Sequence, residues 1–562
     1  MHRTPHRIAA LAALAAFAAP LPVHAQSADL VVTNARIYTV DSLRPTAAAM
    51  AVRGGRVVWV GDAAGAARYR GAGTRVLDLA GRTVIPGMID AHAHLFGLGQ
   101  SLRSVDLVGT RSYAEVVQRV AARARTLPAG SWVTGRGWDQ NDWPEQRFPT
   151  HEALSRAVPD HPVMLERVDG HAALVNAAAM RAARITAATE APEGGKVLRD
   201  AAGRPTGVLV DNAQSLVEGR VPAPTAAQRR AIALAAVKEA NRWGLTGVHE
   251  AGVGREVIDT YEALAREKRF TLRDYVMVSG SDEASLRHYL ARGPQSALHD
   301  GHLWVRAVKL YADGALGSRG AALIAPYSDD PSNRGLLVTP PERLRDVAQR
   351  AYAAGFQVNV HAIGDQANRT ALDVIESAVG ASGGTRDHRF RVEHAQVLAP
   401  ADIPRFARLR AIPSMQASHQ TSDMPWAEQR LGAERVKTAY AWRALRNTGV
   451  IVPNGSDFPV EQVNPLLSFH AAFTRESPEN EPDGGWHPEQ RMTRDEALRS
   501  MTIWAAYAGF QETELGSLTP GKYADFVVLD QDIMRVAASD VLKTNVLSTW
   551  IGGRVVYERA TP

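Results

Sequence analysis

The middle of this chain alternates apolar, strand-like runs with helix-like stretches rich in Ala, Arg and Glu. The alternation extends from about residue 84 to residue 510. Its clearest stretch runs through residues 305–309, 341–354, 357–361, 368–378 and 390–394. Strands that alternate with helices are typical of βα units. The pattern therefore predicts an α/β fold whose parallel strands form either a barrel or a sheet.

Both ends of the chain are β-like instead. Residues 29–62 contain short apolar runs separated by turn residues such as Gly54-Gly55, and residues 524–557 repeat the pattern around Gly552-Gly553. Neither end is long enough to form a stable sheet alone. We therefore expect residues 26–85 and 511–562 to pair into one small composite domain, a β-sandwich beside the barrel. Residues 86–510 would form the barrel, with an insertion of roughly 101–240 after its first strand.

The first 25 residues resemble a secretory leader. Arg3 and Arg7 precede an apolar run over residues 8–19, and prolines and a small-residue cleavage site at residues 23–25 follow. A membrane anchor is the alternative, but about 12 apolar residues are too few for a bilayer core that needs roughly 20. We expect residues 1–25 to be a signal peptide, the mature chain to be periplasmic or secreted, and no stable membrane insertion after cleavage.

Charge and cysteine content narrow the function further. The 562 residues carry 64 basic and 59 acidic side chains, which are spread along the chain and give a formal charge of +5. Nothing in that distribution indicates a nucleic acid as partner. We expect a small-molecule substrate, and a homo-oligomer stays open. Because the chain has no cysteine, any metal ion must bind to nitrogen and oxygen ligands.

An apolar run over residues 84–91 ends in His92-Ala93-His94. Residues two apart on a strand point to the same side, so both imidazoles can reach one metal ion at the carboxyl end of the strand. A His-x-His sequence alone is weak evidence for such a site. Other candidate ligands further along the chain strengthen the interpretation as a metal site.

Four more candidate ligands each close a strand-like run. They are Lys309, His361, His394 and Asp457. Barrel enzymes take their catalytic residues from the carboxyl ends of several strands, which is the placement seen here. Taken singly, the lysine could be a surface residue and each histidine a satisfied core or loop group. Six such residues in strand-end order are hard to explain in that way.

The six residues and three longer motifs resemble the amidohydrolase superfamily. Its pattern is His-x-His on the first strand, Lys on the fourth, His on the fifth and sixth, and Asp on the eighth, and all six positions have a match. Residues 309–319, 361–365 and 392–396 look like its YtcJ-like (amidohydrolase 3) branch. The resemblance covers nearly the whole mature chain. It implies a TIM-type (β/α)8 barrel beside a composite β domain built from both chain ends.

Coordination chemistry suggests roles for these side chains. His92 and His94 would hold a first ion, and His361 and His394 a second. Asp457 would contact the first ion and act as the catalytic proton shuttle. We expect one or two divalent ions, with zinc favoured by the imidazole and carboxylate ligands, although iron, manganese or cobalt fit the same set. The resemblance further implies that Lys309 could be carbamylated and bridge the two ions.

Five residues are weaker candidates for substrate contacts, each with a plain alternative. They are Trp138, Asp139, His171, Arg319 and His419. Trp138 and Asp139 could shape the pocket from the insertion, unless Trp138 is simply a core residue. Arg319 could bind a carboxylate or carbonyl, or form a surface ion pair. His171, after a turn, and His419, after the seventh strand, could each contact the substrate or be structural.

These features predict a metal-dependent amidohydrolase that cleaves a carbon–nitrogen bond other than a peptide bond. A lactonase, a phosphotriesterase or a cyclic-imide hydrolase could use the same metal site, because fold and metals do not fix the substrate. A non-catalytic exported protein that binds a ligand in the barrel is a further alternative. A missing metal ligand would favour it, and none of the six is missing.

Overall fold

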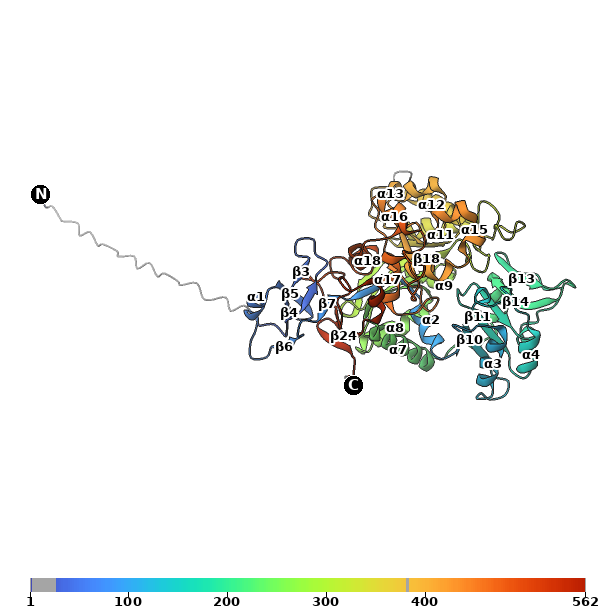
Figure 1. Cartoon of the computed structure of the whole chain (residues 1–562), viewed down its shortest axis with the longest axis horizontal. Helices are drawn as coiled ribbons and strands as arrows, with labels where there is room; N and C mark the ends of the chain where they lie inside the picture. Colours follow the sequence, from blue (N-terminus) through green and yellow to red (C-terminus); the bar gives the residue numbers. More distant parts are fainter. Residues whose placement is uncertain (1, 3–26, 381–383, 561–562) are drawn as a thin grey trace.

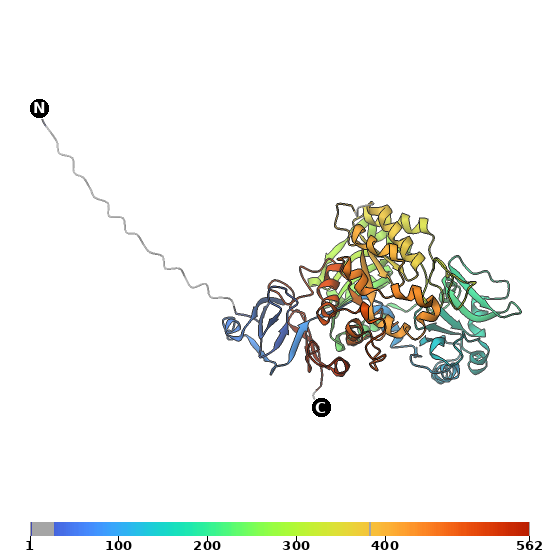
Figure 2. The same ribbon diagram turned by 45° about the horizontal axis from the view of Figure 1, so that its top comes forward.

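The computed structural model describes residue 2, residues 27–380 and residues 384–560. The predicted leader, residues 1–25, lies outside the described residues apart from His2. The described chain is elongated, with terminal β-strands at one end, a barrel in the middle and the insertion at the far end (Figure 1). Figure 2 shows the same order of the three parts after rotation.

Eight parallel strands form the central barrel. In spatial order they are β8 (Met88–Ala93), β15 (Leu245–Val253), β16 (Arg273–Ser279), β18 (Leu303–Tyr311), β19 (Gln357–Ala362), β20 (Arg391–His394), β21 (Ile412–Gln416) and β22 (Asn454–Gly455). Each neighbouring pair is parallel. His94 N donates to Phe458 O at 2.8 Å and Asp457 N to His92 O at 2.7 Å, which brings the last strand back beside the first. The alternation read from the sequence is thus a nearly closed barrel of the TIM type.

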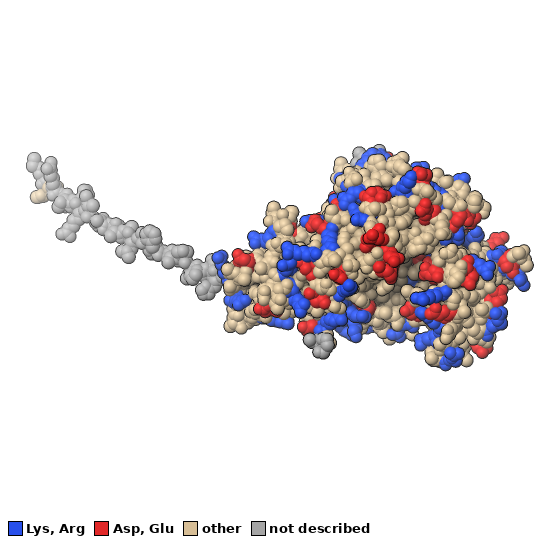
Figure 3. Space-filling view, viewed as in Figure 1, with Lys and Arg blue, Asp and Glu red and all other residues tan. Residues whose placement is uncertain are grey.

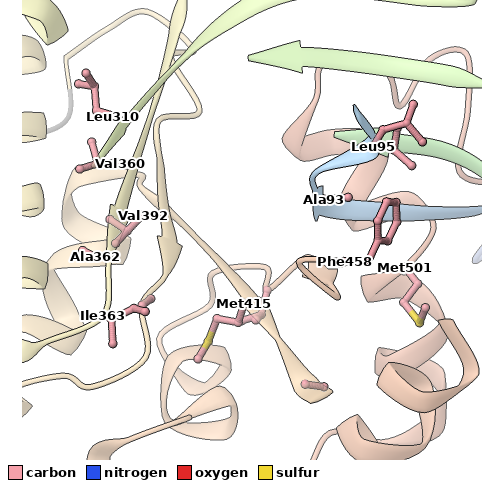
Figure 4. Packing of buried hydrophobic residues seen from close by; sticks show 14 of the residues in the cluster. Ala93, Leu95, Leu310, Val360, Ala362, Ile363, Val392, Met415, Phe458 and Met501 are labelled. Atoms are coloured by element: carbon pink, nitrogen blue, oxygen red, sulfur yellow. The ribbon is translucent and has the colours of Figure 1, made fainter. Parts of the chain in front are cut away.

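Helices cover the outside of these strands because each carries one apolar face. In α11 (Pro341–Ala353), Leu344, Val347 and Ala351 are buried at intervals of three and four residues. The same spacing recurs in α12 (Asp365–Val379). Figure 4 shows part of the resulting core, with Val360 of β19 and Val392 of β20 among its packed side chains. This packing fixes the strand ends from which the candidate ligands project.

The two ends of the chain meet in one sheet. β23 (Phe526–Leu529) pairs antiparallel with β7 (Thr83–Pro86) in a six-stranded sheet ordered β25-β24-β23-β7-β2-β3. A second sheet has the order β5-β4-β1-β6. Their other strands are β1 (Leu30–Thr33), β2 (Arg36–Tyr38), β3 (Thr46–Ala47), β4 (Ala49–Arg53), β5 (Arg56–Gly61), β6 (Arg75–Asp78), β24 (Val546–Ile551) and β25 (Arg554–Glu558). One hydrophobic cluster contains Val32 and Met50 from the second sheet and Phe526 and Trp550 from the first.

Phe526→Ala is expected to destabilise this joint between the chain ends. The Phe526 side chain is fully buried, and its ring stacks on Trp550 with 5.2 Å between centroids. Removing a buried phenyl ring costs roughly 3–5 kcal/mol, so the midpoint of thermal unfolding should fall by several degrees. Val555→Ala, which shortens a side chain that is 38% exposed in the same sheet, is the control and should leave the midpoint nearly unchanged. Equal midpoints for the two variants would contradict the assigned packing.

The insertion forms a separate sheet with its own hydrophobic cluster. Its order is β13-β14-β12-β11-β10-β9, from β9 (Val105–Asp106), β10 (Val133–Trp138), β11 (Val163–Arg167), β12 (Ala172–Val175), β13 (Gly195–Arg199) and β14 (Pro205–Asp211). Helix α7 (Ala226–Arg242) does not belong to this unit, because Ile232 and Ala236 pack in the barrel cluster. The predicted limit near residue 240 therefore falls inside a barrel helix. Among the described residues, no helix combines the length and apolarity needed to cross a bilayer.

Candidate metal centre

A cavity of about 880 Å³ opens at the carboxyl ends of the barrel strands, where the insertion faces the barrel. The barrel contributes His94, Lys309, His361, His394 and Asp457 to its wall. The insertion contributes Arg136, Asp139, Glu166, Arg167, Asp169 and His171. Active sites of TIM barrels occupy this end of the barrel. The cavity is therefore the place where the predicted ligands can meet a substrate.

One group of candidate metal-ligand atoms comes from the ends of the first and last strands and the residues just after them. His94 Nε2 lies 3.0 Å and His92 Nε2 3.4 Å from Asp457 Oδ1. Asp457 reaches them because β22 approaches β8 closely: a Cβ atom at Gly455 would lie only 2.5 Å from His92 N. No side chain larger than hydrogen fits there. The sequence Asn454-Gly455 thus allows the last strand to deliver Asp457 to the His-x-His pair.

The other three predicted ligands lie next to this group. Lys309 Nζ is 3.2 Å from His92 Nε2. The His394 ring lies 4.8 Å from the His92 ring and 4.5 Å from the His361 ring, between centroids. All six residues are therefore gathered at one end of the barrel. His92 is fully buried beneath the cavity, whereas the other five line it.

Burial sets the protonation of these side chains. It lowers the pKa of His361 and of His394 well below the usual histidine value, with neighbouring imidazoles adding to the effect. It also lowers the pKa of Lys309 to about 8. Burial raises the pKa of Asp457, but the surrounding imidazoles, with His92 the strongest, outweigh burial and hold that pKa well below its usual range. Neutral imidazoles and an ionised carboxylate are the forms that bind metals.

The donor set fits a divalent transition ion. Two groups of three residues place one ligand atom each within 4.8 Å of one another: His92, His94 and Asp457, and His394, His419 and Asp457. Imidazole nitrogen and carboxylate oxygen are preferred ligands of zinc and its neighbours, whereas magnesium and calcium prefer oxygen alone. The chemistry of the residues therefore matches the predicted type of ion.

The weaker candidates divide into two sets. Asp139, His171 and His419 line the cavity. Trp138 does not line it: its side chain is fully buried in the hydrophobic cluster of the insertion, and its indole N–H donates to Leu165 O at 2.8 Å. Trp138 is the last residue of β10, and Asp139 follows it with extended backbone. Consecutive extended residues point to opposite sides, so the two side chains face different surroundings. Trp138 is a core residue, the alternative given above.

Arg319 also lies away from the cavity wall. Its guanidinium pairs with Asp329, at 2.9 Å, in the loop that follows β18. The proposed contact with a substrate carboxylate is therefore replaced by an ion pair, again the alternative given above. The sequence does not show which way the side chain of an arginine at the end of a long motif points. The fold of the loop decides where it points.

His171 is brought to the site by the insertion. Its Nδ1 lies 2.7 Å from Asp211 Oδ1 at the end of β14, and its ring lies 5.1 Å from the His361 ring. Burial lowers the pKa of His171, but Asp211 outweighs burial and raises it overall. The pair gives the insertion a polar group that faces the candidate metal ligands.

Sequence reasoning missed the residues that orient His92. Glu393 Oε2 lies 2.5 Å from His92 Nδ1, and Glu393 Oε1 lies 2.6 Å from Arg391 Nε, with all three side chains fully buried. Burial raises the pKa of Glu393, but Arg391 and His92 outweigh it and keep the carboxyl ionised. The contact leaves His92 Nε2 free to bind an ion. The available signal was a pair of charged residues, Arg391 and Glu393, two positions apart on a buried strand.

Glu393→Gln is expected to weaken metal binding while leaving the ligands in place. Partners of metal-bound imidazoles typically contribute 10- to 100-fold in affinity, so the zinc dissociation constant should rise by about that factor. Competition with a chromophoric chelator measures it. Glu434→Gln, at a side chain that is 85% exposed, is the matched control. Unchanged affinity in the Glu393 variant would contradict the orienting role.

Comparison with known proteins shows the family of this chain. Residues 75–557 match the family model described as "Amidohydrolase family". The chain is 38% identical to Protein LONG AFTER FAR-RED 3 of Arabidopsis thaliana, over 94% of this chain and 92% of that protein. It is 34% identical to Putative amidohydrolase YtcJ of Bacillus subtilis, over 88% and 92%. It is 30% identical to N-substituted formamide deformylase of Arthrobacter pascens, over 95% and 99%.

A solved structure extends the comparison to three dimensions. The crystal structure of an uncharacterized metal-dependent hydrolase from Pyrococcus horikoshii OT3 superposes with a TM-score of 0.73 at 28% identity. The match covers 91% of this chain and 99% of that one. The predicted membership is confirmed: this chain belongs to the amidohydrolase family, in the branch that includes YtcJ.

Proposed function

We propose that this hydrolase cleaves an amide-type carbon–nitrogen bond other than a peptide bond in a small molecule. The observation that carries the proposal is the convergence of Asp457 with His92 and His94 at the floor of a cavity large enough for a small substrate. The likeness to N-substituted formamide deformylase supports the bond type. N-substituted formamides are therefore the first substrates to test.

The residues that would hold metal ions are the six gathered at the barrel end. We propose zinc as the ion and a carbamate on Lys309 as a bridge between two ions. The lowered pKa of Lys309 supports the carbamate, because an uncharged amine is the form that reacts with carbon dioxide. A bound divalent ion supplies Lewis acidity toward a carbonyl oxygen and makes water acidic enough to lose a proton near neutral pH.

Asp457 moves the proton in this proposal. Its carboxylate is ionised and lines the cavity, so it can accept a proton from the attacking water. It then gives that proton to the nitrogen of the leaving amine, which departs in neutral form. His171 and Asp139 face the same cavity from the insertion and are proposed to contact the substrate. His419 is proposed as a contact at the opposite wall.

Other features of the mature protein are proposed on the sequence and surface together. Acidic and basic groups are interspersed over the face shown in Figure 3, which supports a small-molecule substrate over a nucleic acid.

We propose export through the leader to the periplasm or medium. We also propose a β-sandwich as the arrangement of the two terminal sheets, supported by their shared hydrophobic cluster. A homo-oligomer is compatible with this arrangement.

A substrate panel tests the proposal. Mature protein loaded with zinc is incubated with an N-alkyl formamide, an N-acyl amino acid, a lactone, a phosphotriester and a cyclic imide of similar size, and product amine or acid is measured. The proposal predicts that kcat/KM is highest for an open-chain amide or formamide. A higher kcat/KM for the lactone, the phosphotriester or the cyclic imide would show that the proposed bond type is wrong. Binding without turnover of any compound would favour the ligand-binding alternative.

A further inference from the structure

The two carboxylate oxygens of Asp457 face different histidines. Oδ1 lies 3.0 Å from His94 Nε2 and 3.4 Å from His92 Nε2. Oδ2 lies 3.4 Å from His419 Nε2, on the wall contributed by the residues after β21. The carboxylate therefore separates two sets of imidazoles, and only the first set contains the His-x-His pair.

His419 and His394 form the second set. Their rings are stacked, with 5.8 Å between centroids and 18° between planes. The ligand atoms of His394, His419 and Asp457 lie within 4.8 Å of one another, and all three residues are buried. A tetrahedral zinc ion with bonds of about 2.0–2.1 Å to nitrogen spaces its ligand atoms by roughly 3.4 Å. The distance from His419 Nε2 to Asp457 Oδ2 matches that spacing.

Each of these imidazoles is held by its other nitrogen. His419 Nδ1 lies 2.9 Å from Glu461 Oε1, which also accepts the Ser422 hydroxyl at 2.7 Å. His394 Nδ1 lies 2.8 Å from Gln416 Oε1. Metal-bound histidines typically donate their second ring N–H to a carboxylate or carbonyl oxygen, which fixes the tautomer. With each Nδ1 donating in this way, each Nε2 is left as an acceptor, and the ligand atoms of both histidines lie within 4.8 Å of a carboxylate oxygen of Asp457.

We propose that His419, instead of contacting the substrate, is a metal ligand and completes a second ion position with His394 and Asp457 Oδ2. The simpler alternative is that His419 is protonated and merely pairs with the two carboxylates beside it, Asp457 and Glu461. The proposal differs in placing the ion where that proton would sit. It rests on the metal-dependent function proposed above but not on the choice of substrate.

Zinc titration of the metal-free mature protein, in competition with a chromophoric chelator, tests the assignment. The wild type is expected to bind two ions. His419→Asn should keep one ion at unchanged affinity and bind the other at least 100-fold more weakly. In a His92→Asn background, which damages the first position, the remaining ion should be lost when His419→Asn is added. His288→Asn, at a partly exposed histidine outside the cavity, is the matched control and should bind as the wild type.

Glu461→Gln keeps His419 and guards against a folding defect in the histidine variant. It should weaken the second ion by about 10- to 100-fold and leave the first unchanged. Two ions of wild-type affinity in both His419→Asn and Glu461→Gln would overturn the assignment. So would a wild type that binds a single ion whose affinity does not respond to His419→Asn. Because bound ions are counted without substrate, failure of the substrate proposal does not affect the result.

Discussion

Asp457→Asn should reduce kcat by about 10²- to 10⁴-fold, the usual contribution of a positioned acid–base group. The amide cannot accept the proton from water or deliver it to the leaving nitrogen. Its oxygen can still approach His92 and His94, so the fold and much of the bound metal should remain. Steady-state kinetics on a substrate turned over by the wild type, with metal content measured on the same samples, checks the prediction.

The matched control is Asp483→Asn, which makes the same chemical change at an exposed aspartate away from the cavity. Its kcat should equal that of the wild type. Near-normal turnover by the Asp457 variant would rule out Asp457 as the proton carrier. A loss of turnover that merely parallels a loss of metal would show that Asp457 acts as a ligand alone.

Lys309→Ala should lower kcat by about 100-fold or more, since loss of a bridging anion is expected to cost about 3 kcal/mol of barrier stabilisation. The side chain is 1% exposed and its Nζ lies 3.2 Å from His92 Nε2, at the centre of the ligand group. If a carbamate is the active form, a short carboxylate such as acetate or propionate should restore part of the activity by occupying the vacated space. Assays with and without added carboxylate measure both effects.

Lys437→Ala removes a lysine side chain that is 57% exposed and serves as the control. It should show full activity and no response to carboxylates. Wild-type activity of the Lys309 variant without added carboxylate would contradict a role for this lysine at the metal centre. Rescue that depends on the size of the carboxylate would indicate that the acid enters the cavity left by the side chain.

Local sequence patterns predicted parallel strands in a barrel or a sheet and singled out the six metal-site candidates, and the family resemblance then implied the TIM-type barrel. Each of these residues closes an apolar run, and parallel strands bring their carboxyl ends together. His92 and His94 could be paired because their spacing of two places them on one side of a strand. Lys309, His361 and His394 needed the correct order of strands, which the alternation supplied. The cavity brings these residues together as the pattern implied.

What the sequence did not reveal is the direction of certain side chains and a contact between residues far apart in the sequence. Trp138 and Asp139 are neighbours, yet one is fully buried in the insertion core and the other lines the cavity. Arg319 follows the path of a loop that no local pattern specifies, and it meets Asp329 there. Glu393 contacts His92, 301 positions away. A single sequence carries no record of such a pairing.

The metal content of the mature protein is the most direct test of the central claim. The chain should be purified without chelators and with bicarbonate present, then examined by elemental mass spectrometry alongside a hydrolysis assay. The account predicts two zinc-like ions per chain, with turnover lost on chelation and regained on zinc addition. A folded protein that contains no metal and takes up none on reconstitution would contradict it.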